Sequence, residues 1–425
     1  MTRPRIALIS NALGLGGTDK MLESYATRQD RSRFDVHVIG VYELGERAAG
    51  LRAAGIDVSC ADGERDRLAE LLRGTDLAHV FRWGMAEPIV PAACRAAGVA
   101  RMVETNIFGS VDPTPDREAF DVHLFVSTMC LLRYRKRVGA DASAEFHRRH
   151  RVLSAPIEHE ALARHAPPSK RAAREALGLD PDRPVVGRVG RASDTKWRNL
   201  VVDMLPPLLE LVPEAQVLLV GATPAKVERL RRLGVLGRCV LHEPTLDPMR
   251  LAAFYLACDV FASASEIGES QGISINEAQS FAIPIVTCST PWADNAQVEF
   301  VEHGRSGWLA STPRPFAEAV ADLLRDPARA AAFGEEGRRN IERMLSVDAI
   351  PARLGDLYAE LLGQGPPAAW SPDPEEIEAF ARDYPRRARA EFRPLTRAER
   401  VQARTSRLRE HWGHLAVQAR TLLRR

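Results

Sequence analysis

The chain has 425 residues, of which 45% are hydrophobic and 27% are charged, and its formal net charge is +2. This length accommodates two or three domains, and the composition is that of an ordinary globular protein rather than a disordered one. The balanced charge argues against a protein that binds nucleic acid over its whole surface.

The six cysteines are scattered, and no two of them have the C-x-x-C spacing of a zinc site or a redox dithiol. Most lie in apolar runs, as buried cysteines do in proteins of reducing compartments. The N-terminus enters an apolar run at Ile6 without the features of a signal peptide, and no run of about 18 apolar residues follows. We therefore expect a cytoplasmic protein.

Along the first part of the chain, short apolar runs alternate with longer amphipathic ones, which predicts a doubly wound parallel sheet flanked by helices. Strands are expected at residues 5–10, 35–41, 78–81, 101–104 and 122–127. Helices are expected at residues 19–29, 46–54, 66–72, 88–97 and 129–138.

The loop after the first predicted strand contains Gly16 and Gly17, which would let the backbone line a cleft. A plain tight turn is the alternative. The G-x-G-x-x-G fingerprint of dinucleotide-binding proteins fails, because Asp19 stands where the third glycine would be. This departure argues against a dinucleotide oxidoreductase.

Polar residues also follow two later strands of this half. Arg82 comes after the strand that contains His79, and Glu104 and Asn106 come at the end of the next one. In a parallel sheet these residues would lie at the same edge, where an acceptor substrate could bind. A simple ion pair between Arg82 and Glu104, and a hydrogen-bonded structural role for His79, are the alternatives.

A polar, proline-bearing stretch at residues 165–170 predicts a linker, after which the α/β pattern restarts. Strands are expected at residues 184–190, 215–220, 238–242, 260–264, 283–288 and 307–310. Helices are expected at residues 199–211, 224–233, 249–257, 277–281 and 315–324. Two such halves imply a cleft at the carboxyl ends of the strands. Asp180 and Asp182 form a D-x-D pair, but the intervening proline favours a turn, and we expect no metal.

The strand that opens the second half is followed by Gly190, Arg191 and Lys196. A guanidinium can donate two hydrogen bonds to phosphate oxygens, an ammonium adds a point charge, and a glycine permits close approach of the backbone. Two unrelated surface cations are the alternative. The position directly after a strand favours an anion-binding loop.

Glu269 and Glu277 stand eight positions apart, across Gly272 and a short apolar stretch. Backbone N–H groups of Gly272, Ile273 and Ser274 at the start of a helix would face a phosphate or a sugar. The two carboxylates would accept hydrogen bonds from sugar and ribose hydroxyls. The alternative is a solvated helix start whose acids favour the helix dipole.

Beyond about residue 362 the chain becomes proline-rich and then basic. Residues 380–425 contain thirteen arginines and four acidic residues, with apolar residues at helical spacing between Leu408 and Leu423. This pattern predicts an amphipathic helix that lies on an anionic membrane surface, or one that packs on the protein itself or on a partner.

Several of these segments together resemble the retaining GT-B glycosyltransferases of family 4, also called glycosyl transferases group 1. The resemblance is carried by Gly190-Arg191 with Lys196, by Glu269 with Glu277, and by the segments 259–263, 299–309 and 333–339. It implies a donor nucleotide sugar bound by the C-terminal domain, an acceptor bound by the N-terminal one, transfer with retention, and no metal or other cofactor.

The same resemblance assigns domains and roles. Residues 1–165 would bind the acceptor, 171–345 would bind the nucleotide sugar, 346–362 would form a helix that crosses back to the N-terminal domain, and 363–425 would be a linker with a basic helical tail. Arg191 and Lys196 would bind the diphosphate, Glu269 the transferred sugar and Glu277 the ribose.

The family's usual histidines on the N-terminal side are replaced here, near Arg82 and near Asn106. Because of this replacement, a second hypothesis is a catalytically degenerate protein that serves as a partner or scaffold. A GT-B-like epimerase or phosphorylase is a further alternative. The leading prediction is a metal-independent hexosyltransferase that acts on a glycan, lipid-linked or small-molecule acceptor, in the cytoplasm or peripherally at the inner face of a membrane.

Overall fold

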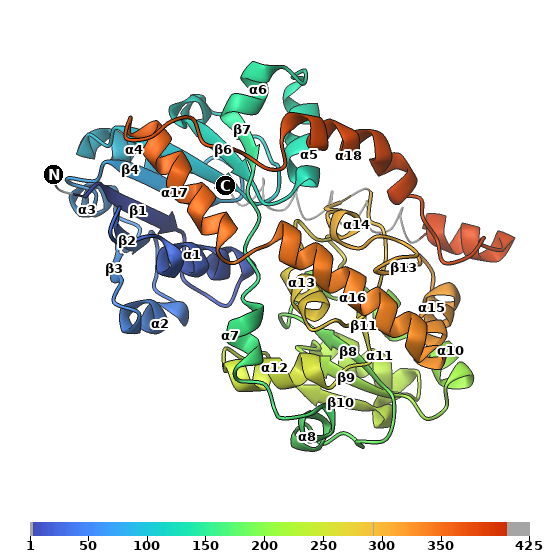
Figure 1. Cartoon of the computed structure of the whole chain (residues 1–425). Coiled ribbons are helices and arrows are strands. Elements are labelled where there is room, and N and C mark those ends of the chain that lie inside the picture. The colour runs from blue at the N-terminus through green and yellow to red at the C-terminus, as the bar shows by residue number, and fades with distance from the viewer. Residues whose placement is uncertain (1–2, 292, 406–425) are drawn as a thin grey trace. The chain divides into compact units, whose positions relative to one another are not determined.

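The computed structural model describes residues 3–291 and 293–405 (Figure 1). The chain divides into two compact units. The first unit combines the chain up to Pro156 with Leu345–Asp383, and the second combines Ile157–Met344 with the described residues from Tyr384 onward. The chain therefore leaves the first unit after Pro156, returns to it at Leu345 and leaves it again after Asp383.

The first unit is built on a parallel sheet of seven strands, in the order β3-β2-β1-β4-β5-β6-β7. Its strands are β1 (Arg5–Ser10), β2 (Asp35–Gly40), β3 (Asp57–Cys60), β4 (Leu77–Arg82), β5 (Arg101–Asn106), β6 (Val122–Phe125) and β7 (His150–Val152). Its helices are α1 (Gly17–Arg28), α2 (Arg47–Ala53), α3 (Arg65–Leu71), α4 (Ile89–Ala97), α5 (Thr128–Val138), α6 (Ala144–Arg149) and α17 (Ala349–Leu361). The five strands expected from the sequence are all present, whereas the short β3 and β7 were not expected.

The second unit is built on a parallel sheet of six strands, in the order β10-β9-β8-β11-β12-β13. Its strands are β8 (Val185–Val189), β9 (Gln216–Val220), β10 (Cys239–His242), β11 (Val260–Ser263), β12 (Ile285–Thr287) and β13 (Gly307–Leu309). Its helices are α7 (His159–Ala163), α8 (Lys170–Ala176), α9 (Leu200–Asp203), α10 (Leu205–Leu211), α11 (Pro224–Arg232), α12 (Pro248–Leu256), α13 (Ile273–Ser280), α14 (Gln297–Phe300), α15 (Pro313–Arg325) and α16 (Pro327–Met344). The single helix expected at residues 199–211 is divided into α9 and α10.

Alternation along the strands of the second unit explains why both faces of its sheet are covered. Val186 and Val217 pack into a core with Phe316, whereas Val185 and Leu218 pack into another core. Successive residues of a strand point to opposite faces, so a run of consecutive apolar residues requires helices on both sides. The predicted α/β class, with two doubly wound parallel sheets, is confirmed.

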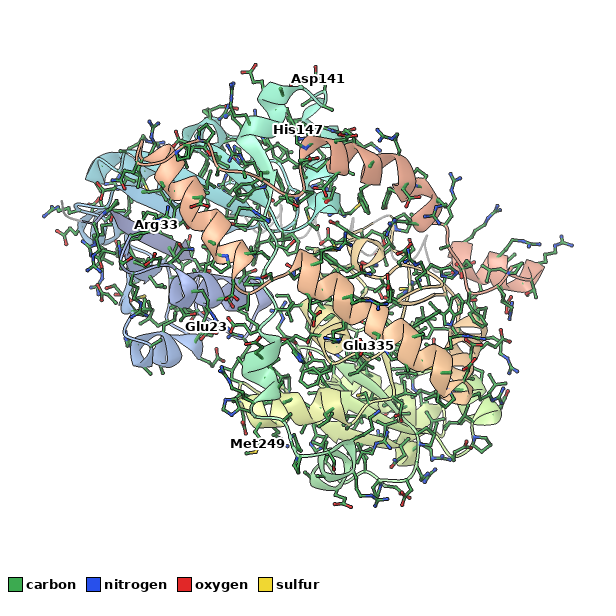
Figure 2. All side chains as sticks on the ribbon, viewed as in Figure 1. Glu23, Arg33, Asp141, His147, Met249 and Glu335 are labelled. Carbon is green, nitrogen blue, oxygen red and sulfur yellow. The ribbon has the colours of Figure 1, made fainter. Side chains whose placement is uncertain are left out.

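Helix α17 is held in the first unit by contacts with residues distant in sequence. Tyr358 Oη lies 2.6 Å from Nδ1 of His79 on β4, and the other ring nitrogen lies 2.7 Å from Thr105 Oγ1. Arg33, which is labelled in Figure 2, adds an exposed ion pair of 3.1 Å to Asp356. Burial lowers the pKa of His79 to about 3, so His79 is neutral at physiological pH. The interpretation of His79 as a hydrogen-bonded structural histidine is the one that these contacts support.

The described part of the C-terminal segment packs on the protein. The helix α18 (Pro374–Arg387) begins in the first unit, and Phe392 contacts Trp308 of the second unit at 5.2 Å between ring centroids. Arg393 forms ion pairs with Glu318 and Glu399. The apolar positions from Leu408 to Leu423, on which the predicted membrane-surface helix depends, lie outside the described residues. No described helix is both long and apolar enough to span a membrane.

Candidate functional site

The loop that follows β8 is fixed by close contacts of its backbone. Gly190 N–H donates to the carbonyl of Val220 at 3.2 Å, which ties the loop to the end of the neighbouring strand β9. Gly221 has a φ of +81°, and a Cβ atom there would lie 2.1 Å from the carbonyl oxygen of Gly190. A glycine is therefore required at position 221 both by its backbone conformation and by the space available.

The loop presents one paired and one unpaired cation. Lys196 Nζ lies 2.8 Å from Glu269 Oε2, and the two side chains are 21% and 11% exposed. Arg191 is exposed and forms no ion pair with a residue that the structure describes, while its carbonyl accepts a hydrogen bond of 3.1 Å from the indole of Trp197. The structure thus joins Lys196 to Glu269, 73 residues apart, as the predicted site requires.

The loop that carries Glu269 is held from two sides. The carbonyl of Thr195 accepts hydrogen bonds from the N–H groups of Glu266 and Ile267, at 3.1 and 3.2 Å. Glu269 itself accepts from Ala296 N–H through its carbonyl, at 2.8 Å, and donates its N–H to Gln297 Oε1 at 3.3 Å. Its carboxylate is therefore oriented by a rigid backbone rather than by Lys196 alone.

Helix α13 begins next to this carboxylate. Gly272 caps it with a φ of +88°, and Ile273 and Ser274 form its half-exposed first turn. The backbone N–H groups of Ile273 and Ser274 make no hydrogen bond within the described part of the chain. N–H groups at a helix start attract anionic groups. The binding of a phosphate or sugar by Gly272, Ile273 and Ser274 stays a prediction.

Glu277 lies deeper, in the second turn of α13. It is 5% exposed, and its Oε2 accepts a hydrogen bond of 2.5 Å from the hydroxyl of Tyr255 on α12. Burial, together with the nearby carboxylate, raises the pKa of Tyr255 well above its usual value, so the hydroxyl remains a donor. The predicted ribose contact of Glu277 would use the remaining acceptor capacity of its carboxylate.

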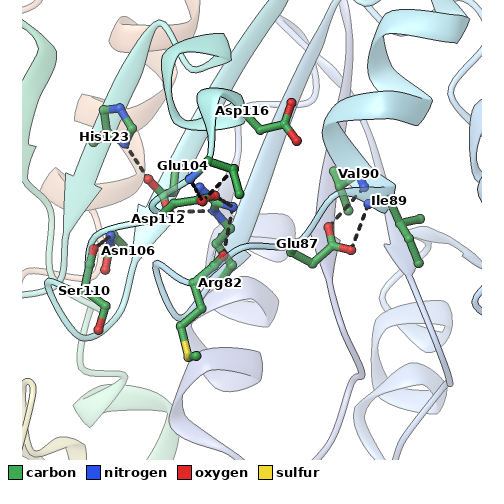
Figure 3. A network of polar contacts seen from close by, with 12 residues as sticks. Arg82, Glu87, Ile89, Val90, Glu104, Asn106, Ser110, Asp112, Asp116 and His123 are labelled. Carbon is green, nitrogen blue, oxygen red and sulfur yellow. Dashed lines mark hydrogen bonds and ion pairs between the residues drawn. The ribbon is translucent and has the colours of Figure 1, made fainter. Parts of the chain in front are cut away.

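The candidate residues of the first unit form a buried charge cluster (Figure 3). Arg82 Nε lies 2.7 Å from Glu104, and its Nη1 lies 2.9 Å from Asp112. Glu104 also contacts the ring of His123. Burial alone would raise the pKa of Glu104, but His123 and Arg82 outweigh it and lower that pKa below the usual value. The alternative of an ion pair between Arg82 and Glu104 is thus what the structure contains.

The remaining first-unit candidates lie outside this charge cluster. Asn106 is buried and donates to the carbonyl of Ser110 at 2.9 Å. Gly16 caps helix α1, which begins at Gly17, and Asp19 accepts hydrogen bonds from Ser10 and Gly14. The acceptor-binding roles of Gly16, Gly17, Arg82, Glu104 and Asn106 stay predictions.

Several residues around the second-unit loops were not singled out from the sequence. Asp294 accepts from the hydroxyl of Ser270 at 2.7 Å, Gln297 orients Glu269, and Tyr255 binds Glu277. Arg188 is buried in β8. The sequence could have revealed it, since a charged residue inside an apolar parallel strand is unusual. The D-x-D pair lies in a turn, where Asp182 pairs with Arg171.

Comparison with known proteins finds similarity over the part of the chain that carries these loops. Residues 183–326 match the family described as Glycosyl transferases group 1. The D-inositol 3-phosphate glycosyltransferase 2 of Catenulispora acidiphila is 35% identical over 212 residues, which are 47% of this chain and 48% of that protein. The chain thus spans about half the length of this relative.

Two further similarities extend over more of the chain. A GDP-mannose-dependent alpha-(1-6)-phosphatidylinositol monomannoside mannosyltransferase of Mycobacterium tuberculosis is 28% identical over 315 residues, covering 68% of this chain and 78% of the relative. The structure of Anabaena HepE in complex with UDP and glucose matches with a TM-score of 0.69 at 17% identity, covering 84% of this chain and all of that one. The predicted GT-B fold is confirmed.

Proposed function

Since residues 183–326 match the family described as Glycosyl transferases group 1, we propose that the protein transfers a sugar from a nucleoside-diphosphate sugar to an acceptor. The observation that carries this proposal is the Lys196–Glu269 ion pair, at 2.8 Å. The same loop carries Arg191, whose guanidinium forms no ion pair with a residue that the structure describes. This arrangement sets a cation for a phosphate and a carboxylate for a sugar hydroxyl side by side.

The chemistry follows from the charges of the donor. When the bond between the sugar and the diphosphate breaks, negative charge develops on the leaving phosphate, and Arg191 and Lys196 would stabilise it. The N–H groups of Gly272, Ile273 and Ser274 would bind phosphate or sugar oxygens. Glu269 would accept hydrogen bonds from the transferred hexose, and Glu277 from the ribose.

Two finer features belong to the same proposal. We expect transfer with retention of configuration, as the family resemblance implies. We also expect the two cations to stabilise the leaving group without a divalent metal ion or other cofactor, so that activity persists in the presence of EDTA. Complete loss of activity in EDTA, restored by Mg²⁺ or Mn²⁺, would contradict the metal-free reaction.

The acceptor is proposed to be a glycan or a lipid-linked molecule bound by the first unit. In support, one relative is named for a phosphatidylinositol mannoside and another for D-inositol 3-phosphate. The basic residues of 380–425 would favour peripheral contact with anionic lipid at the inner face of a membrane. Flotation with phosphatidylglycerol vesicles tests this contact, and equal partitioning with and without residues 388–425 would contradict it.

A transfer assay tests the proposed function directly. The protein is incubated with UDP-glucose or GDP-mannose and with a lipid or inositol phosphate acceptor, and the released nucleoside diphosphate is measured with the glycosylated product. We expect release of nucleoside diphosphate by the wild type and a rate about 10²–10³ lower in the Lys196→Met variant. No hydrolysis or transfer with a broad panel of UDP and GDP sugars would contradict an enzymatic role.

A further inference from the structure

A single arginine connects the two ends of the loop that carries the proposed diphosphate ligands. Arg188 lies within β8 and is only 2% exposed. Its Nη1 donates to the carbonyl of Val189 at 2.5 Å, and its Nη2 donates to the carbonyl of Lys196 at 2.7 Å. Its guanidinium also lies over the ring of Trp197, 5.3 Å from the centroid. The side chain therefore fixes the backbone at both ends of the loop.

Among the described residues, the charge of Arg188 has no direct counter-ion. Within the described part of the chain, no carboxylate lies within ion-pair distance of its guanidinium. Burying an uncompensated charge is costly, and burial accordingly lowers the pKa of Arg188, while the more distant Glu269 acts in the opposite direction. Backbone packing alone does not explain why a cation stands here.

Arg174 shows how the same unit treats a buried arginine with a purely structural role. Arg174 is 7% exposed, and it donates to the carbonyl of Ala257 at 3.0 Å. Unlike Arg188, it also binds a carboxylate, that of Asp259, at 2.5 Å. The two arginines match in burial and in carbonyl contacts and differ in charge compensation.

The uncompensated charge lies directly behind the anion-binding loop. A Cβ atom at Gly190 would meet the guanidinium of Arg188 at 3.2 to 3.5 Å. Gly190 is the first residue of the loop that ends at Lys196, so the buried charge and the two loop cations surround the same backbone. In a poorly solvated position, a charge acts over several ångströms with little screening.

We propose that Arg188 is a positioning residue whose buried charge is compensated by the diphosphate of the donor. It holds Lys196 through its backbone carbonyl and adds a third positive charge beneath the loop. This inference rests on the proposed function, because it assumes that a nucleoside diphosphate binds to the loop.

The experiment compares the full-length protein with its Arg188→Met, Arg188→Lys and Arg174→Met variants. Calorimetry gives the dissociation constants for UDP, GDP, uridine and guanosine, and thermal unfolding gives the stability of each variant. For the nucleoside diphosphate that the wild type binds, we expect Arg188→Met to weaken binding about tenfold and to change nucleoside affinity less than about twofold. Arg174→Met should lower stability and leave both affinities unchanged.

The lysine variant separates charge from geometry. Arg188→Lys keeps the charge and loses the planar fork that reaches two carbonyls, so we expect diphosphate affinity within about threefold of wild type and turnover reduced about tenfold. If Arg188→Met fails to fold, the Arg188→Lys variant is the test. A turnover of Arg188→Lys equal to that of the wild type would then overturn the inference.

Other outcomes are equally decisive. Unchanged UDP and GDP affinity in a folded Arg188→Met protein would overturn the inference and leave the proposed function intact. An equal loss of affinity in Arg174→Met would reduce the effect to general destabilisation and would also overturn it. Failure of the wild type to bind either UDP or GDP would instead overturn the proposed function, and the inference with it.

Discussion

Both units place charged residues at the carboxyl ends of parallel strands, but they use them differently. In the first unit, Arg82 is 4% exposed and contacts two carboxylates, those of Glu104 and Asp112. In the second unit, Lys196 contacts one carboxylate and remains partly exposed, while Arg191 contacts none among the described residues. The first cluster is internally compensated, whereas the second has positive charge to spare for a ligand.

The difference teaches that position in the fold does not distinguish a binding site from a structural cluster. A buried charge that meets all its partners within the protein stabilises one conformation of its loops. A partly exposed cation with an incomplete set of partners is available to bind an anion. The predictions below test this distinction, from the largest expected effect to the smallest.

The largest effect is expected when the compensated cluster is broken. Arg82→Met leaves Glu104 and Asp112 buried without their cation, which should lower the free energy of unfolding by about 3–5 kcal/mol. Urea unfolding measures this loss. Arg95→Met is a matched control, since Arg95 forms an exposed ion pair of 2.9 Å with Asp116 and should cost no more than about 1 kcal/mol. Equal losses in the two variants would contradict a special role for the buried cluster.

The second effect concerns turnover. Lys196→Met should reduce kcat by about 10²–10³, equivalent to about 2.7–4 kcal/mol, because the leaving phosphate loses a cation. Lys170→Met is the control, since Lys170 also pairs with a carboxylate at 2.8 Å, that of Asp259. Asp259 directly precedes β11, so this pair lies at the amino end of the strand and not at the carboxyl end. Steady-state kinetics should show wild-type turnover in the control, and a similar loss in both would argue against a local role.

A smaller effect links His79 to the pH dependence of stability. Its folded pKa of about 3 lies below the usual 6.5, so the unfolded chain binds more protons as the pH falls. The stabilisation is complete above pH 6.5 and is progressively lost towards pH 3, amounting to about 2 kcal/mol between pH 8 and pH 5.

The variant His79→Gln isolates this contribution, because it removes the titrating group at the contact with Tyr358. The free energy of unfolding, measured from pH 8 to pH 5, should fall less steeply in the variant than in the wild type. Parallel curves for the two proteins would show that His79 does not carry the proton linkage.

The sequence was sufficient to predict that Lys196 and Glu269 lie close together, because both residues obey local rules. Lys196 and Glu269 each follow a predicted strand, and adjacent parallel strands bring their carboxyl ends together. The same reasoning could not tell that Arg82 is enclosed, because Asp112 and His123 come from other segments and carry no motif. The strands β3 and β7 escaped prediction because each contains two polar residues and therefore has no continuous apolar run.

Helix α17 shows a second limit of prediction from local sequence patterns. The family resemblance implies a helix over residues 346–362, but the placement of α17 in the first unit depends on the contact of Tyr358 with His79, 279 residues apart. Likewise, the role of Arg188 depends on carbonyl groups that no side-chain motif records. Tertiary contacts of this kind become visible only in the structure.

The central claim is that the second unit binds a nucleoside diphosphate through the cations of the loop after β8. The most direct measurement is a crystal structure of the protein with UDP or GDP, whichever it binds more tightly. The account predicts phosphate oxygens within hydrogen-bond distance of Arg191 and Lys196, with the ribose next to Glu277. Phosphates bound elsewhere, with both cations facing solvent, would contradict it.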